Sequence, residues 1–187
     1  MRIITGSARG IRLTTLEGEE TRPTAERVKE AVFSMLQFDI EERDVLDLFS
    51  GSGQMALEAL SRGASGAVLI DKSKKAVSII NDNIRKTRLE DRCSVINMDA
   101  LDYIKSCGGN KFDIIFIDPP YASGLYAKVL RALNLSEMLK PSTLIVCESD
   151  YDFISDDPDL ETIFYTKKTA RYGRSVVTIL APRKDGM

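Results

Sequence analysis

The segment IFIDPPYASG, at residues 115–124, places an acid, two prolines and a tyrosine after an apolar run. Proline has no amide hydrogen for a sheet ladder, so Pro119 and Pro120 must end the strand or lie just beyond it. Asp118 and Tyr121 stand on either side of this stiff pair. The pattern predicts a rigid strand tip that presents a carboxylate and an aromatic ring to one cleft, although a capped strand end with a surface tyrosine is the alternative.

A second group of glycines and acids lies upstream, in DLFSGSGQMA at residues 47–56. Gly51 and Gly53 stand where an expected strand turns into a helix, and Ala56 completes a G-x-G-x-x-A pattern. Glycines there let the backbone approach a ligand closely. Asp71 ends the next expected strand, at the spacing of an acid that accepts hydrogen bonds from ribose hydroxyls. Each feature alone also fits a tight turn or a solvated strand end, but together they predict a cofactor that contains a ribose.

Two cofactors fit this pattern, NAD and S-adenosylmethionine. NAD would place its pyrophosphate on the helix N-terminus. Asp47 would repel a pyrophosphate there, whereas its charge suits the ammonium group of a methionine moiety. Asp99, at the end of the third expected strand, adds an acceptor for the adenine amino group. The acids at successive strand tips therefore favour S-adenosylmethionine.

Alternating apolar and amphipathic stretches from Asp44 onward supply the elements that position these tips. We expect five strands with helices between them, at residues 44–50, 66–73, 93–100, 112–118 and 142–149. That alternation predicts right-handed βαβ units in an α/β fold with a mostly parallel, doubly wound sheet. Two more strands, at 161–168 and 175–182, are joined by so short a link that they predict an antiparallel hairpin at the sheet edge. Open sheets of this kind bind ligands at the carboxyl ends of their strands, where the acids fall.

The first 40 residues differ from the rest and are expected to form an extension, with residues 41–187 as the main domain. RIITG and GIRLTTL can pair as a hairpin, and RPTAERVKEAVFSML has apolar residues at helical spacing. We expect this hairpin and helix to act as a lid over RNA and cofactor; a plain extra structural layer is the alternative.

The composition excludes several kinds of chemistry. The 187 residues carry a net charge of −2 at pH 7 and include three cysteines and no histidine. Without histidine, Ser–His and Cys–His nucleophiles are excluded, as are most transition-metal sites, so we expect no metal. The cysteines are too far apart in sequence for a zinc pair, and a disulfide framework is not expected. With no signal core and no membrane-spanning stretch, the sequence predicts a reduced cytoplasmic protein.

Two basic stretches stand out in a chain whose net charge is slightly negative. Residues 1–12 and 166–175 contain arginines and lysines but no acid. Local basic patches of this kind are typical of a phosphate footprint, although solvated surface charge is the alternative at each position. The predicted RNA contacts are Arg2, Arg9, Arg12, Arg22, Arg27, Lys167, Arg171, Tyr172 and Arg174.

DPPY after the fourth expected strand, with DLFSGSG after the first, resembles the amino-group methyltransferases that use S-adenosylmethionine. GSARGIRL, TRPTAERVKEAVFSML, DLFSGSGQMALEALSRGA, FDIIFIDPPY and ARYGRS are similar to the RsmD family, which methylates the exocyclic N2 of one guanine in 16S ribosomal RNA. The resemblance covers nearly the whole chain. It implies a Rossmann-like class I methyltransferase with a seven-stranded sheet. The expected cofactor contacts are Asp47, Phe49, Gly51, Ser52, Gly53, Asp71, Lys72, Asp99, Ala100 and Asp118.

The proline tip suits methyl transfer to an amino group whose lone pair is delocalised into a ring. Positive charge moves from sulfur to nitrogen during transfer, and Asp118 can accept a hydrogen bond from the amino group and stabilise that charge. The carbonyl of Pro119 can accept the second N–H, Pro120 helps to hold the loop stiff, and Tyr121 offers a stacking face to a flipped base. These four are the expected catalytic residues.

Other functions stay open at this point. A DNA adenine or a protein glutamine amide could replace the guanine, although no separate DNA-reading domain is recognisable. An NAD-dependent oxidoreductase would lack a catalytic histidine and a substrate domain, and a non-catalytic RNA-binding module would leave the acidic strand tips unexplained. The leading expectation is a monomeric 16S rRNA guanine-N2 methyltransferase, acting on free rRNA or on an assembling small subunit.

Overall fold

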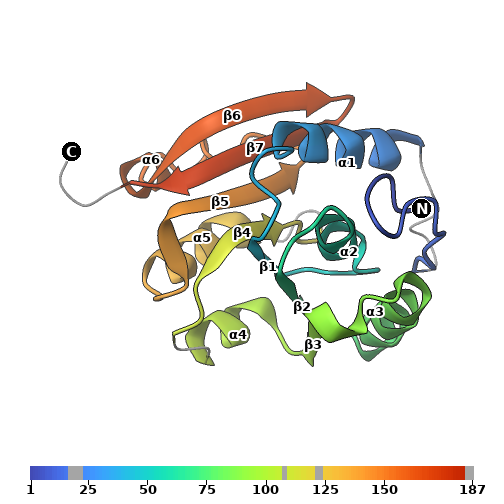
Figure 1. The fold of residues 1–187 in the computed structure, drawn as a ribbon. Coiled ribbons are helices and arrows are strands. Elements are labelled where there is room, and N and C mark those ends of the chain that lie inside the picture. Colours follow the sequence, from blue (N-terminus) through green and yellow to red (C-terminus); the bar gives the residue numbers. More distant parts are fainter. Residues whose placement is uncertain (17–22, 107–108, 121–123, 184–187) are drawn as a thin grey trace.

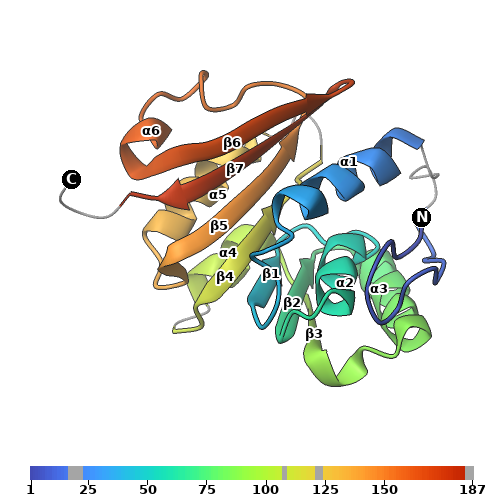
Figure 2. The same ribbon diagram turned by 45° about the horizontal axis from the view of Figure 1, so that its top comes forward.

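The computed structural model describes residues 1–16, 23–106, 109–120 and 124–183, and a seven-stranded sheet runs through the molecule with helices on both faces (Figures 1 and 2). The strands are β1 (Asp44–Asp47), β2 (Gly66–Asp71), β3 (Cys93–Asn97), β4 (Phe112–Ile117), β5 (Leu139–Ser149), β6 (Phe164–Tyr172) and β7 (Ser175–Pro182). The helices are α1 (Pro23–Met35), α2 (Gln54–Ser61), α3 (Lys74–Thr87), α4 (Ala100–Ser106), α5 (Leu125–Asn134) and α6 (Leu160–Ile163), with a 3-10 turn η1 at Glu90–Arg92.

The sheet has the order β3-β2-β1-β4-β5-β7-β6. The first five strands in this order are parallel, and β7 runs antiparallel to both β5 and β6. This confirms the predicted doubly wound sheet with an antiparallel hairpin at one edge. Because β1 to β5 all point the same way, their carboxyl ends meet at one edge of the sheet, which we call the carboxyl edge.

Several strand boundaries differ from the sequence expectation, and two of the differences have a direct physical reason. The apolar run from residue 44 ends as a strand at Asp47, because the next residues turn and the amide of Gly53 donates to the carbonyl of Ser50 at 2.6 Å. The first hairpin strand begins at Phe164 rather than at residue 161, because α6 occupies the preceding residues and Leu160 buries its side chain there.

Side chains from the two faces of the sheet form two hydrophobic cores. Residues of α1, α2 and α3 pack on one face, and residues of α4, α5 and α6 pack on the other. Neighbours along a strand alternate between the cores, as Val45 and Leu46 do. Strand β4 is buried along its whole length, which explains its unbroken apolar run.

Residues 1–16 fold back on themselves and pack against α2 and α3 (Figure 2). One antiparallel bridge joins Arg2 to Arg12, and backbone hydrogen bonds such as that from the amide of Ile3 to the carbonyl of Ile11 at 2.9 Å also link the two arms, so the expected hairpin is present in a short form. Other backbone amides of this segment bond to α2, such as that of Ser7 to the carbonyl of Ser61 at 2.8 Å. Gly6 has φ 87°, and a Cβ there would lie 1.7 Å from that same carbonyl oxygen, so only glycine fits.

A fully buried carboxylate, Glu58 of α2, holds this N-terminal loop in place. Its oxygens accept hydrogen bonds from the amides of Ile4 at 2.7 Å and Thr5 at 3.1 Å. Arg62 lies at 2.8 Å and the buried amine of Lys29 at 3.6 Å from the same carboxylate. Burial lowers the pKa of Lys29, while the charge of Glu58 opposes that shift. The loop therefore shares a buried ionic centre with α1 and α2.

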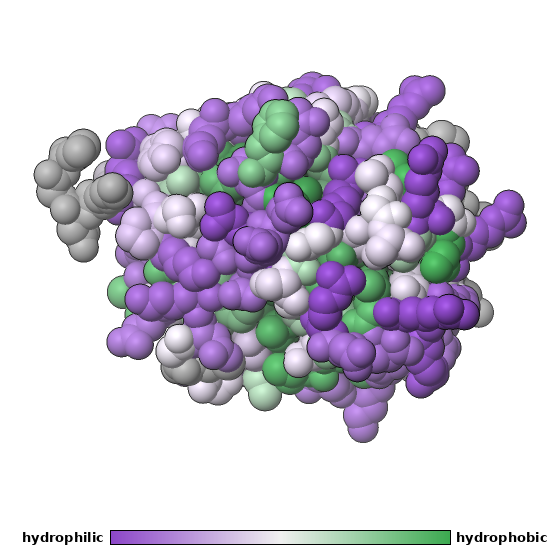
Figure 3. Space-filling model, viewed as in Figure 1, coloured by the Kyte–Doolittle hydropathy of each residue, from purple (hydrophilic) through white to green (hydrophobic). Residues whose placement is uncertain are grey.

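The surface seen in Figure 3 is mostly hydrophilic, with hydrophobic side chains in small separate groups. The large apolar side chains exposed on the described part of the chain are Phe38, Met98, Leu135 and Tyr165. None of the helices in the described ranges is long and apolar enough to cross a membrane.

Candidate functional site

Three of the acids expected from the sequence lie at the carboxyl edge. Asp47 is the last residue of β1 and Asp71 the last of β2, while Asp118 directly follows β4. Asp47 is paired with Leu69 on one side and with Phe116 on the other, so Asp71 and Asp118 each project two residues beyond it. The buried tip of β1 is therefore flanked by two longer strands that carry carboxylates.

The glycine loop is tied directly to the tip of β2. The amide of Gly51 donates to Asp71 Oδ2 at 2.9 Å, and the amide of Ser73 donates to Oδ1 at 2.8 Å. Gly51 and Gly53 have φ of 54° and 78°, which L side chains rarely adopt. A Cβ at Gly53 would also lie only 3.1 Å from Leu69 Cδ2. These contacts give a backbone reason for both glycines of the motif.

Asp47 is buried, with 3% of its surface exposed. Burial raises the pKa of its carboxyl to about 7, and the negative charge of Asp71 adds to that shift. The amides of Phe49 and Ala56 and the hydroxyl of Ser50 oppose it only in part. None of these groups carries a positive charge, so an ionised carboxylate at this position favours a cationic ligand.

Asn83 of α3 is a residue of the site that our sequence reasoning missed. Its side-chain amide donates to the carbonyl of Ser52 in the glycine loop at 2.9 Å and to that of Thr14 at 2.8 Å, and its oxygen accepts from the amide of Thr14 at 2.8 Å. The signal was present in the sequence, because Asn83 follows Ile80 by three residues and so shares the apolar face of its helix.

The remaining expected cofactor contacts follow the carboxyl ends of β1, β2 and β3. Asp99 lies in the turn after β3, where its Oδ1 accepts the amide of Leu101 at 2.9 Å, and Ala100 begins α4 as a buried residue. Lys72 follows β2 and is exposed, and Ser52 is buried beneath the loop. Phe49 is half-buried and packs against the core on the α4 side.

The tip of β4 carries the residues expected to be catalytic. Asp118 and Pro120 are exposed and Pro119 is buried, whereas Tyr121 lies outside the described residues. Beneath the tip, the hydroxyl of Tyr126 donates to the carbonyl of Glu148 on β5. Burial, with a smaller contribution from the charge of Asp118, raises the pKa of Tyr126. Tyr126 is therefore a buried aromatic residue near the tip that also binds the next strand.

The expected RNA contacts of the β6–β7 hairpin separate into two groups. Arg171, Tyr172 and Arg174 lie at the turn between β6 and β7, and the start of β7 is paired with Ser149 at the carboxyl end of β5. This turn is therefore at the carboxyl edge. Lys167 instead lines a cavity of about 160 Å³ at the opposite edge, together with residues that begin β4 and β5.

The arginines of the first 27 residues are exposed where the structure describes them. Arg9 lies next to Ala8, whose amide donates to Ser61 Oγ at the end of α2. Because this end of α2 leads into the start of β2, Arg9 lies near the amino ends of the strands, opposite the carboxyl edge. Arg2 and Arg12 form the bridge at the base of the loop, and Arg27 lies in the second turn of α1. Arg22 lies outside the described residues.

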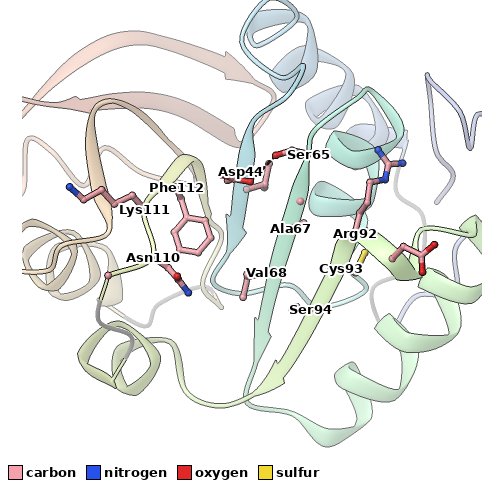
Figure 4. Close-up of a pocket in the computed structure, with 14 residues that line it drawn as sticks. Asp44, Ser65, Ala67, Val68, Arg92, Cys93, Ser94, Asn110, Lys111 and Phe112 are labelled. Carbon is pink, nitrogen blue, oxygen red and sulfur yellow. Dashed lines mark hydrogen bonds between the residues drawn. The ribbon is translucent and has the colours of Figure 1, made fainter.

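A larger cavity, of about 480 Å³, lies opposite the carboxyl edge and its three acids, at the amino ends of β1 to β4 (Figure 4). Asp44, Arg92, Cys93 and Phe112 are among the residues that line it. Ser65 donates to Asp44 and Arg92 donates to the carbonyl of Ala64, so polar groups here already have partners. In the described ranges, no group of three His, Cys, Asp or Glu residues is arranged to hold a metal ion.

Comparison with known proteins gives consistent matches along nearly the whole chain. The model of the family described as Conserved hypothetical protein 95 matches residues 1–181. Ribosomal RNA small subunit methyltransferase D of Haemophilus influenzae is 34% identical over 171 residues, which cover 90% of this chain and 89% of that protein. The protein of the same name from Escherichia coli is 34% identical over 152 residues, covering 81% and 76%. The solved structure of Escherichia coli yhhF, provisionally described as a methyltransferase, has a TM-score of 0.85 and 29% identity and covers 99% of both chains.

Proposed function

The chain belongs to the family described as Conserved hypothetical protein 95, the RsmD family, and from that premise we propose that it methylates the N2 amino group of one guanine in 16S ribosomal RNA. Its activity at the coarser level is methylation of ribosomal RNA with S-adenosylmethionine as the methyl donor. The observation that carries the finer proposal is the placement of the Asp118–Pro119 tip beside the locked glycine loop, at one edge of the sheet.

The residues of the carboxyl edge fit S-adenosylmethionine better than NAD. A buried Asp47 with a raised pKa favours the ammonium group of the methionine moiety and would repel a pyrophosphate. Asp71 is positioned by the amides of Gly51 and Ser73 and can accept hydrogen bonds from ribose hydroxyls. Asp99 is the proposed acceptor for the adenine amino group. When bound, this cofactor supplies an activated methyl group on a sulfonium centre.

The chain's own contribution to the reaction is orientation and electrostatic stabilisation. Asp118 accepts one N–H of the guanine amino group, and the carbonyl of Pro119 accepts the other, so the nitrogen lone pair points toward the methyl group. As the new N–C bond formed and the S–CH3 bond of the donor broke, positive charge would pass from sulfur to nitrogen. The carboxylate of Asp118 would stabilise that charge, and the proton that nitrogen then loses would pass to this carboxylate or to water. The two prolines restrict the backbone, so little ordering is needed when the base arrives. Tyr121 is the proposed stacking surface for a base taken out of its helix.

The basic turn between β6 and β7 supports an approach of RNA to this edge. Arg171 and Arg174 are exposed there, and Tyr172 is half-buried against the core. Residues 1–40 are proposed to close over the cofactor and RNA, because Asn83 links Thr14 to the glycine loop. We place the protein in the cytoplasm as a monomer.

Nucleoside mass spectrometry of 16S rRNA from a strain lacking the gene tests the proposal. We expect one N2-methylguanosine to disappear and to return when the gene is supplied on a plasmid. A plasmid encoding Asp118→Asn should not restore it. Persistence of every N2-methylguanosine in the deletion strain would refute the substrate assignment, and loss of a methyladenine instead would move the target to another base.

Calorimetry with purified protein tests the cofactor separately. S-adenosylmethionine should bind, and NADH should not compete with it. Tight binding of NADH without binding of S-adenosylmethionine would contradict the cofactor proposed for this edge.

A further inference from the structure

A second carboxylate, that of Glu148, lies on the strand next to Asp118. Ile117 of β4 is paired with Cys147 of β5 in parallel register, so Asp118 and Glu148 are the next residues on neighbouring strands. Ile117 and Cys147 both face the core on the α4 side. Their successors therefore face the α1 side. Val177, which is paired with Glu148, belongs to the core on that side.

The position of Glu148 is fixed from two sides. The ladder with β7 holds its backbone, and the hydroxyl of Tyr126 donates to its carbonyl. Its side chain is half-buried. Burial raises the pKa of its carboxyl, and a hydrogen bond with the side chain of Ser175 opposes that shift and favours the ionised, accepting form. Glu148 is thus a well-ordered acceptor at the carboxyl edge rather than a mobile surface acid, and the proposed mechanism leaves it without a role.

The chemistry of the nucleobases gives a reason for two acceptors side by side. The acceptors of Asp118 and Pro119 can hold any amino group, so they do not distinguish guanine from adenine or cytosine. The ring nitrogen N1 beside the amino group of guanine carries a hydrogen and donates. In adenine and cytosine, the ring nitrogen beside the amino group is a bare acceptor. An acceptor next to the amino-binding acceptors therefore fits guanine and meets a repelling lone pair in the other two bases.

We propose that Glu148 accepts a hydrogen bond from guanine N1–H while Asp118 holds the N2 amino group, and that Glu148 thereby selects guanine as the base to be methylated. This inference rests on the proposed function of the same edge. It assigns to a residue of β5 the discrimination that the DPPY motif alone does not provide. Sites built to hydrogen-bond a substrate group reject analogues that lack it more strongly than apolar pockets do.

The test compares RNA containing guanine with RNA containing 2-aminopurine at the same position. Methylation of unmodified 16S rRNA, both free and within small-subunit particles, first identifies which guanine is the target. 2-Aminopurine keeps the N2 amino group but has a bare N1. The wild-type protein should prefer guanine by about a hundredfold in kcat/KM, which matches the loss of one charge-assisted hydrogen bond and the repulsion that replaces it.

The variant Glu148→Gln should narrow that preference by at least about tenfold, because its amide can turn an N–H toward the bare N1. Loss of the guanine O6 affects both proteins alike and cancels in the comparison. The control Asp150→Asn changes an exposed acid two residues away and should keep the wild-type preference. Calorimetric binding of S-adenosylmethionine checks that each variant is folded.

The outcomes separate this inference from the proposed function. If the wild-type protein methylates no guanine N2, the proposed function fails. If it methylates guanine and Glu148→Gln leaves the preference unchanged, whether or not overall activity falls, the role of Glu148 is overturned. If Glu148→Gln does not fold, the test uses the wild-type protein alone. Similar rates of the wild-type protein on the guanine RNA and the 2-aminopurine RNA would then overturn the inference.

Discussion

The side chain of Asn83 donates to the carbonyl of Ser52 at 2.9 Å, so helix α3 holds the glycine loop from below. The same side chain exchanges two hydrogen bonds with the backbone of Thr14. Because Asn83 is fully buried, these bonds are shielded from water and depend on one another. The glycine loop and the N-terminal loop are thus joined through a single amide group.

Replacing Asn83 by alanine should loosen both loops. We expect the free energy of unfolding to fall by about 1–3 kcal/mol, because buried backbone groups lose their partners. The affinity for S-adenosylmethionine should fall by about tenfold, because the glycine loop that contacts the cofactor loses the hydrogen bond that orders it. Urea unfolding and calorimetry measure these effects. Asn81→Ala, an exposed change on the same helix, is the control, and equal effects of both changes would contradict the link.

Asp47→Asn should make the protein more stable and less able to bind its cofactor. The carboxyl pKa rises from 3.8 to about 7 on folding, so the folded state loses stability as pH climbs through this interval. At pH 8 the variant should gain up to about 4 kcal/mol, whereas below pH 3.8 the gain should vanish. Urea unfolding at several pH values measures this. A gain that does not depend on pH would contradict the assignment.

The same shift predicts how cofactor binding by the wild-type protein depends on pH. Protonated Asp47 cannot attract an ammonium group, so affinity for S-adenosylmethionine should increase as pH rises through about 7. Calorimetry across this interval checks the sign, with Asp47→Asn as the control that should lack the dependence. An affinity that falls over the same interval would exclude Asp47 as the partner of the ammonium group.

Asp118→Ala should stop methyl transfer while leaving cofactor binding nearly intact. The rate should drop by at least about a thousandfold, because a charge-stabilising acceptor is removed from the reacting nitrogen. Single-turnover transfer of a labelled methyl group measures the rate, and calorimetry measures affinity. Asp102→Asn, an exposed change on α4, should alter neither. An equal loss of rate and cofactor affinity would show that Asp118 acts on the cofactor rather than on the base.

Glu58→Gln should release the N-terminal loop. The change leaves Lys29 buried without its counter-charge. Breaking a buried ion pair in this way lowers the free energy of unfolding by about 3–5 kcal/mol. Hydrogen exchange of the amides of Ile4 and Thr5 should rise more than that of strand β4. Glu30→Gln on the exposed face of α1 is the control. Unchanged protection of both amides would contradict the anchoring role of Glu58.

Charge reversal should separate the two groups of basic residues. Arg171→Glu and Arg174→Glu change the carboxyl edge and should weaken RNA binding and flatten its salt dependence, since each phosphate contact contributes about one unit to the slope. Lys167→Glu makes the same kind of change at the opposite edge and should have little effect. Electrophoretic binding assays at several salt concentrations measure this. Equal losses in all three would indicate a footprint that extends across the sheet.

Much of the architecture could be predicted because it depends on local pattern. Apolar runs identified the parallel strands, and apolar residues at helical spacing identified the helices between them. Gly51 and Gly53 marked the ligand loop, since L side chains rarely adopt their backbone angles. The acids Asp47, Asp71 and Asp118 could be assigned to one edge, because parallel strands bring their carboxyl ends together. The hairpin of residues 1–16 is short, and its attachment to α2 could not be predicted, since those hydrogen bonds join residues more than fifty positions apart in the sequence.

By itself, the sequence determined the order of the elements and the strand tips that carry acids, because these depend on residues close together along the chain. Only the tertiary structure decided which distant groups meet. It placed Asn83 under Ser52, made the Asp47 carboxyl a buried acid with a raised pKa, and set Glu148 beside Asp118 through the β4–β5 register. It also separated Lys167 from Arg174 along one hairpin. Hydrogen bonding, burial and register depend on packing between elements, which spacing within a single element does not specify.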